Sequence, residues 1–208
     1  MTRWLGVALL PRADHMVSAI EVQRDIGAGH MLRPVLSMEG NLPHVTVYQG
    51  PFTDAVVPRR ELGCIVRAVH LPREIHLIST GVVYQPPGWV FLSLERTPLL
   101  EKLQEAVLAV VEPYLDREAF DTSRDTSLFT ESERASHARY GYRYTGEAYT
   151  PHITLGRAEE EVAREVVRAA PGRSSVAGRW AFDRLSFYVK GEHGAHAETL
   201  AECELDRM

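Results

Sequence analysis

The sequence predicts an α+β fold with an internal duplication. Segments typical of strands and of helices follow one another in the order strand, helix, strand, helix, strand, strand, helix, long loop, strand, helix, strand, strand. One five-residue motif also occurs once in each half of the chain. Its copies are Pro43-His44-Val45-Thr46-Val47 and Pro151-His152-Ile153-Thr154-Leu155. Composition alone would produce about 0.006 such motifs, so the repetition indicates two related halves.

The first elements alternate between strand and helix. Residues 4–10 form an apolar run typical of a strand, and Asp14 can cap a helix that runs to about Gly27. The first motif begins a strand that Gly50-Pro51 closes. Pro58 lies where a helix would start, and the apolar residues after it recur at helical spacing, as Leu62, Ile65, Val66 and Val69.

The middle of the chain predicts a hairpin followed by a strongly amphipathic helix. Residues 74–84 and 89–94 read as strands on either side of the turn-forming residues 85–88. Thr97-Pro98 is typical of a helix start. The apolar stripe that follows is Leu99, Leu100, Leu103, Val107, Val110, Val111 and Tyr114.

Residues 116–147 interrupt this order. They are polar and show little periodicity, so we expect a long insert that is either functional or disordered. Its end mixes cations with aromatic residues directly before the second motif, and includes Tyr142, Arg143 and Tyr144. The insert is then either a solvated loop or a lid whose arginine meets a phosphate and whose tyrosine stacks on a base.

A helix and a terminal hairpin follow the second motif. The acidic residues 159–161 favour a helix N-terminus, and Pro171-Gly172 ends that helix. Residues 180–189 and 197–205 alternate as two strands, and a slip in the alternation near Asp183 indicates a β-bulge.

Each motif predicts a short strand that presents an imidazole beside a hydroxyl. Residues two apart on a strand point to the same side, so His44 and Thr46 share one face, as do His152 and Thr154. The apolar residues between them then point into the core. If a pseudo-twofold axis relates the two halves, the two histidines meet across a cleft.

Two imidazoles that face one point can divide the roles of general base and general acid near neutral pH. Two hydroxyls beside them can donate hydrogen bonds to a tetrahedral anion, and phosphate fits that description. The sequence therefore predicts hydrolysis of a phosphodiester without a metal, with His44 and His152 as catalytic residues and Thr46 and Thr154 as phosphate-binding residues.

Other residues near the motifs are candidates for substrate binding. Tyr48 shares the face of His44 by alternation, so it either stacks on a base or packs in the core. Arg157 either steers a phosphate or pairs with the acidic residues 159–161. Arg143 of the insert and Tyr149, which precedes the second motif, complete the set, although Tyr149 is also a candidate for covering the core.

A metal site is the alternative use of histidine in this chain. His193 and His196 lie three residues apart in a Gly-containing turn, without further soft ligands nearby. We favour a solvated turn there, and expect neither a metal nor a cofactor.

Composition bounds the partners and the compartment. No stretch of about 18 apolar residues could cross a bilayer, and the apolar start that ends at Pro11 predicts a strand rather than a signal peptide. Cys64 and Cys203 are few and far apart, which favours the reducing cytoplasm. The net charge of −5 argues against an extended nucleic-acid surface but is compatible with a nucleotide or an RNA end. Without a coiled-coil pattern we expect a monomer.

The paired His-x-Thr-x motifs and the element order resemble the 2H phosphoesterase superfamily, which includes the RNA 2′,3′-cyclic phosphodiesterases, or 2′-5′ RNA ligase-like proteins. The second motif, followed by Gly156-Arg157, is especially similar. The resemblance implies one bilobed domain over residues 1–208, in which two antiparallel sheets flank a central cleft and helices lie outside. It also implies that His152 activates water and His44 protonates the leaving oxygen, with the roles exchanged for substrates of reversed polarity.

These observations predict a metal-independent phosphodiesterase that hydrolyses a cyclic (2′,3′) or linear phosphodiester of a nucleotide or RNA end, with a role in RNA processing. Two alternatives stay open. One is a ligase-like enzyme or one that processes a small nucleotide derivative. The other is a catalytically idle module that binds a nucleotide or RNA in the same cleft. The insert at about 116–147 exceeds what the resemblance implies for a minimal member, which leaves the substrate open.

Overall fold

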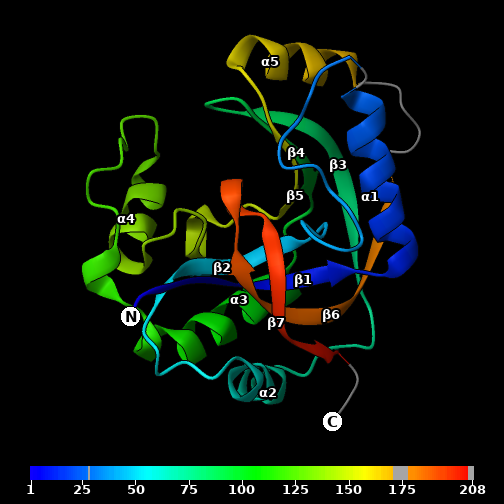
Figure 1. Ribbon diagram of the computed structural model, residues 1–208. Helices are drawn as coiled ribbons and strands as arrows, with labels where there is room; N and C mark the ends of the chain where they lie inside the picture. Colours follow the sequence, from blue (N-terminus) through cyan, green and yellow to red (C-terminus); the bar gives the residue numbers. More distant parts are fainter. Residues whose placement is uncertain (28, 171–177, 206–208) are drawn as a thin grey trace.

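The computed structural model describes residues 1–208 except 28, 171–177 and 206–208. Its described part is an α+β fold (Figure 1). The strands are β1 (Arg3–Pro11), β2 (Val45–Phe52), β3 (Ile75–Gln85), β4 (Trp89–Leu94), β5 (His152–Arg157), β6 (Arg179–Lys190) and β7 (His196–Glu204). The α-helices are α1 (Ala13–Ile26), α2 (Pro58–Ala68), α3 (Pro98–Val111), α4 (Glu131–Tyr140) and α5 (Glu160–Ala169). The predicted helix stop at Pro171-Gly172 lies outside the described residues.

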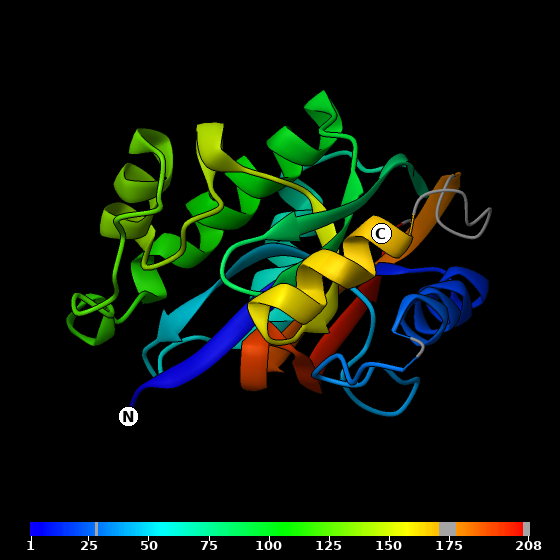
Figure 2. The same cartoon turned by 90° about the horizontal axis from the view of Figure 1, so that it is seen from above.

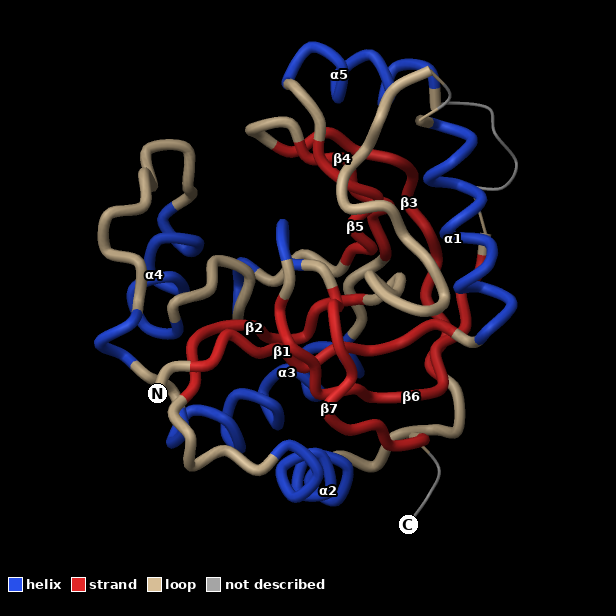
Figure 3. The backbone as a smooth tube through the Cα atoms, in the orientation of Figure 1, coloured by secondary structure: helices blue, strands red, loops and turns tan. Residues whose placement is uncertain are grey.

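The strands form one antiparallel sheet rather than the two separate sheets expected. Its order over the described residues is β1-β2-β5-β4-β3-β6-β7, and β1 also pairs with β6, so six strands close into a ring. The halves are joined because β6 is long enough to pair with β3 at its start and with β1 and β7 beyond it. The strands lie at the centre and the helices around them (Figure 3).

The strand pairings have the twofold relation that the repeated motif predicts. Exchanging β1 with β4, β2 with β5, and β3 with β6 leaves every pairing of the ring unchanged. The helices follow the same relation, since α1 packs on β5 and α3 packs on β2. The strand order thus has the twofold relation expected of a duplication, and β7 is an addition to it.

Both motif strands carry a bulge at the same place. In β2, Val47 is an extra residue opposite β1, and in β5, Leu155 is an extra residue opposite β4. Each follows its motif threonine directly. A third bulge leaves Asp183 of β6 without a partner on β1, which confirms the slip seen in the sequence.

A buried glutamine satisfies the carbonyl of the first bulge. Gln104 of α3 donates from Nε2 to the carbonyl of Val47 at 2.9 Å and to that of Tyr144 at 3.0 Å. Its Oε1 accepts from the amide of Gly146 at 2.9 Å. Because buried backbone groups need partners, this side chain fastens the end of the insert to the first motif strand.

Gln23 of α1 has the equivalent position in the other half. Its Nε2 donates to the carbonyls of Leu155 and Pro34, both at 2.8 Å, and its Oε1 accepts from the amide of Leu36 at 2.8 Å. It fastens the loop that leads to the first motif to the second motif strand. The twofold relation therefore extends to the side chains that support the motifs.

Gln104→Leu is expected to lower the free energy of unfolding by at least about 2 kcal/mol, because three buried backbone groups lose their partner. Urea unfolding measures this change, with Glu105→Ala, an exposed change on the same helix, as the control. An unfolding midpoint equal to that of the parent protein would contradict this role.

The insert contains more regular structure than its composition suggested. The helix α4 forms within it, between the short 3-10 helices Arg117–Ala119 and Gly146–Ala148. Thr130 and Glu133 form a capping box at its N-terminus, a signal that the sequence does contain. No apolar stripe marked this helix, because its buried residues within the described structure are Ser136 and His137. In Figures 1 and 2, α4 lies at one edge of the molecule.

Two end signals read from the sequence do not act as predicted, and several other element ends differ by one residue. The N-cap of α1 is Arg12, and Asp14 lies in the first turn, where it pairs with the Arg12 guanidinium. The strand β2 continues past Gly50-Pro51 to Phe52. Pro51 is tolerated because its carbonyl faces outward, to the amide of Asp116, so the missing N–H would also have faced away from β1.

Within the described residues, no helix has the length and apolar character needed to cross a membrane.

Candidate active site

The two motifs meet at the junction of β2 and β5. These strands pair antiparallel through one residue pair, Val45 with Ile153, which are the middle residues of the two motifs. This register places His44 across from Thr154, and Thr46 across from His152. Both middle residues are fully buried, so the four polar side chains share the opposite face of the junction.

Both histidines are held in the same way by the backbone. Nδ1 of His44 lies 2.7 Å from the carbonyl of Leu42, and Nδ1 of His152 lies 2.7 Å from the carbonyl of Thr150. A carbonyl only accepts, so in the neutral ring the proton sits on Nδ1 and the lone pair on Nε2. Each ring therefore keeps Nε2 for proton transfer.

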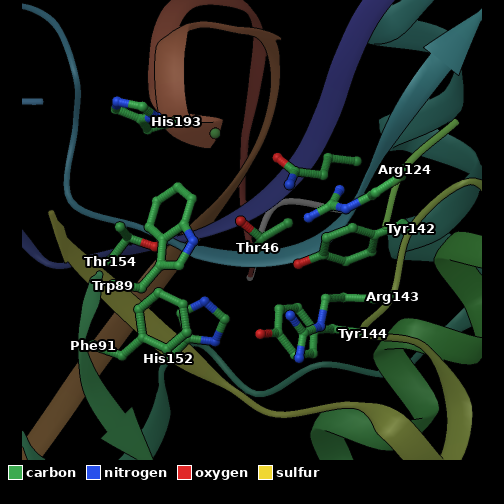
Figure 4. A pocket seen from close by; sticks show the side chains of 12 residues that line it. Thr46, Trp89, Phe91, Arg124, Tyr142, Arg143, Tyr144, His152, Thr154 and His193 are labelled. Carbon is green, nitrogen blue, oxygen red and sulfur yellow. The ribbon is translucent and has the colours of Figure 1, made fainter. Parts of the chain in front are cut away.

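A pocket of about 530 Å³, including its solvent-open mouth, lies at this junction (Figure 4). Thr46, His152 and Thr154 line it, whereas His44 is buried beside the junction and does not. Its remaining walls come from Gln49 of β2, Trp89 and Phe91 of β4, Arg124, Tyr142, Arg143 and Tyr144 of the insert, and His193 and Gly194 of the turn before β7.

Burial keeps both motif histidines neutral. His152 stacks on Phe91 at a ring-centroid distance of 3.8 Å and meets the ring of Tyr144 at 5.4 Å. Loss of solvation lowers the pKa of His152 to about 4, although the Thr150 carbonyl acts in the opposite direction. The pKa of His44 is likewise lowered to about 4 by burial.

A third histidine lies against His44. His196 is 1% exposed, its ring centroid is 5.6 Å from that of His44, and it stacks on Tyr188 at 4.4 Å. Its Nε2 shares a hydrogen bond of 2.8 Å with the hydroxyl of Ser186. Burial lowers the pKa of His196 to about 3. The solvated turn predicted here is therefore wrong for His196, which begins β7, whereas His193 stays in the turn and lines the pocket.

These three histidines make the free energy of unfolding depend on pH. Each binds a proton more weakly in the folded protein than at the unfolded value of about 6.5, so unfolding takes up protons. Stability is thus fully present above about pH 6.5 and is expected to fall as the pH drops towards 4. Thermal unfolding between pH 7 and pH 4 measures this slope. His196→Gln should flatten it and His70→Gln, an exposed change, should not; a pH-independent melting temperature would contradict the account.

The bulge changes which side chain of β2 reaches the pocket. Because Val47 is an extra residue, the alternation reverses after it, and Gln49 rather than Tyr48 lines the pocket. Tyr48 is fully buried in the core and donates its hydroxyl to the carbonyl of Tyr140 at 2.8 Å. The prediction that Tyr48 shares the face of His44 is therefore wrong. Tyr149 is also buried in the core and away from the pocket.

The two candidate arginines differ in their surroundings. Arg143 lines the pocket but is buried, and it donates to one carboxylate oxygen of Glu133 from Nε at 3.1 Å and Nη2 at 2.6 Å. Arg157 lies outside the pocket, over the ring of Trp89 at 5.6 Å, and donates to the carbonyl of Pro87. Among the described residues no ion pair joins it to the acidic residues 159–161.

The insert reaches the pocket, as the lid alternative requires. It contributes two tyrosines and two arginines to the walls, of which Arg124 was not singled out from the sequence. The sequence did not single out Gln49, Phe91 and Arg124, because their positions follow from strand register and loop packing. In the part of the chain that the structure describes, no group of three or more His, Cys, Asp or Glu side chains could hold a metal ion.

No protein-family model matches the chain, and no curated protein matches it in sequence. Solved structures do share its fold. Escherichia coli LigT complexed with 3′-AMP is 16% identical, with a TM-score of 0.57 and 100% coverage of both chains. A protein described as a phosphoesterase is 16% identical, with a TM-score of 0.54 and the same coverage. The protein TT0787 of Thermus thermophilus is 18% identical, with a TM-score of 0.55 and 97% coverage of both chains.

These comparisons establish the fold. LigT has also been crystallised with ATP, with NADP⁺ and with phosphate. The chain therefore shares its fold, over its whole length, with LigT and with the protein described as a phosphoesterase.

Proposed function

We propose that this chain, which has the fold of the 2H phosphoesterases, is a metal-independent phosphodiesterase that acts on a cyclic (2′,3′) or linear phosphodiester of a nucleotide or RNA end. The observation that carries the proposal is the antiparallel pairing of Val45 with Ile153, which gathers two His–Thr pairs on one face. Nucleotide and phosphate complexes of LigT, a protein of the same fold, support this substrate class.

The proposed reaction uses the free Nε2 atoms of the two histidines. One neutral imidazole takes a proton from water while the water oxygen bonds to phosphorus. The other, protonated, gives its Nε2 proton to the oxygen that leaves as the phosphodiester bond breaks. The hydroxyls of Thr46 and Thr154 donate to the anionic oxygens of the phosphate. His152 lines the pocket, which supports the assignment of His152 as base and His44 as acid.

The twofold arrangement suits an in-line displacement. In this proposal the phosphate lies between the two motifs with one histidine on each side, so that water enters opposite the leaving oxygen. Both imidazoles are neutral in the free protein, and the negative charge of a bound phosphodiester favours protonation of one of them. Substrate binding therefore favours the protonated imidazole that acts as the general acid.

The pocket favours a nucleotide or a strand end over a long duplex. The aromatic walls formed by Trp89, Phe91, Tyr142 and Tyr144 can stack on a base. The net charge of −5 also argues against an extended surface that binds the phosphates of a long nucleic acid.

A substrate panel in EDTA tests the proposal. It contains the four nucleoside 2′,3′-cyclic monophosphates and short 2′-5′ and 3′-5′ linked RNA oligonucleotides, and the products are identified by chromatography. We expect at least one class to yield a phosphomonoester or a shortened RNA end. Nucleotide binding without turnover of any substrate would instead support the idle binding module.

A further inference from the structure

Arg124 lies in the segment of the insert between the 3-10 helix Arg117–Ala119 and α4, and it lines the pocket together with Thr46, His152 and Thr154. Figure 4 shows its guanidinium directed into the pocket on the side of Thr46. A residue about 30 positions before the second motif thus reaches the same space as both motif strands.

The other arginines of the described insert are occupied by acceptors of the protein. Arg117 and Arg139 pair with Glu112, at 3.0 and 3.7 Å. Arg143 pairs with Glu133 at 2.6 Å. Arg134 donates to the carbonyl of Phe129.

Arg124 differs from them. Among the contacts of the described residues, its guanidinium has no hydrogen-bond acceptor and rests over the ring of Phe129 at 5.4 Å. Hydrogen bonds from Ser123 and, to a smaller extent, the positive charge of Arg124 lower the pKa of the nearby Asp121 carboxyl. That carboxylate, however, accepts its hydrogen bonds from Ser123, at 3.1 Å from the amide and 2.7 Å from the hydroxyl. Since Phe129 is buried and also holds Arg143 at 4.3 Å, the ring is a fixed platform for Arg124.

A bound phosphodiester would be stabilised by a positive charge in the pocket. The motif histidines are neutral in the free protein, and the charge of Arg143 is balanced by Glu133. A phosphodiester brings one negative charge, and more develops on its oxygens during displacement. Two threonine hydroxyls supply hydrogen bonds but no charge, whereas a guanidinium supplies both.

We propose that Arg124 binds a non-bridging oxygen of the scissile phosphate, so that the insert completes the catalytic site of this chain. This inference rests on the proposed function, because it names a further catalytic residue for the same reaction. The insert then acts as a wall that carries the cation of the site rather than as a solvated loop.

The test compares Arg124→Gln, Arg124→Lys and Arg124→Ala with the parent protein, on a 2′,3′-cyclic mononucleotide and on a dinucleotide with a cyclic end. Arg124→Gln is expected to lower kcat/KM by roughly 100-fold on both substrates, and Arg124→Lys by less. Added guanidinium ion should restore part of the activity of Arg124→Ala. The affinity for inorganic phosphate, measured by calorimetry, should fall about 10-fold in Arg124→Gln.

Arg139→Gln, an exposed insert arginine that pairs with Glu112, is the matched control and should change kcat/KM less than about 2-fold. Because Arg124 is exposed, its variants should keep the parent melting temperature. Unchanged activity and phosphate affinity in Arg124→Gln would overturn the inference but leave the proposed function intact. A loss confined to the dinucleotide would also overturn it, because Arg124 would then contact a neighbouring phosphate. If the parent hydrolyses no substrate, the proposed function fails, and the phosphate titration still decides whether Arg124 binds the anion.

Discussion

Replacing His44 or His152 with alanine is expected to lower kcat/KM for a 2′,3′-cyclic nucleotide by roughly 100-fold to 10,000-fold. In each imidazole a backbone carbonyl holds Nδ1, which leaves Nε2 free for proton transfer. Loss of either ring removes the base or the acid, and the remaining ring cannot fill both roles within one displacement. Steady-state kinetics in EDTA measure the effect.

Two controls separate catalysis from folding. His70→Ala, at an exposed position, should keep the parent activity. His44→Gln and His152→Gln retain a polar side chain in place of the ring, so they should stay folded by circular dichroism yet remain inactive. Parent-like turnover in a folded variant of either histidine would contradict its assigned role.

Thr46→Val and Thr154→Val are each expected to lower kcat by roughly 100-fold to 1,000-fold. Valine keeps the size and β-branching of threonine, so the strands should form as before while one donor to the phosphate is lost. The twofold register predicts similar losses for the two changes. Single-turnover kinetics would measure this loss in the chemical step.

Thr46→Ser and Thr154→Ser should recover most of the activity, because the hydroxyl returns. Thr199→Val, an exposed threonine of β7, should be neutral. If the valine variants were as active as the parent, the hydroxyls would not hold the phosphate, and the chemistry assigned to the motifs would need another anion site.

Periodicity in the sequence was sufficient to locate most elements. The strand β4 begins and ends at the residues predicted, and α3 begins after Thr97, whose side chain accepts from the amide of Leu100. These elements carry strong local signals, namely alternation for the strand, and a cap with a long apolar stripe for the helix. The His–Thr pairs could be found for the same reason, because a whole pair fits within one short strand.

The walls of the pocket could not be predicted in this way. The bulge at Val47 depends on how β2 pairs with β1, and it decides that Gln49 rather than Tyr48 reaches the pocket. The placement of Arg124 depends on how the insert packs on Phe129. The burial of His196 depends on its contacts with Tyr188 and His44. Each property arises between segments that are distant in the sequence.

The joining of the halves into one sheet has a similar origin. Alternation predicts that residues 180–189 form a strand but not which neighbours it has. The start of β6 pairs with β3, and the rest pairs with β1 and β7, so one long strand serves both halves. This shared strand is the reason why the two halves form one sheet and not the two separate sheets expected.

The most direct test of the two-histidine site is a double-mutant cycle followed by ³¹P NMR on a 2′,3′-cyclic nucleotide in EDTA. The parent is expected to convert the cyclic phosphate to a monoester, and His44→Ala and His152→Ala should each be slower by roughly 100-fold or more. The double variant should be about as slow as the slower single variant, because the two rings act as one unit. Independent, multiplying losses, or turnover that survives in the double variant, would contradict a shared acid–base pair at this junction.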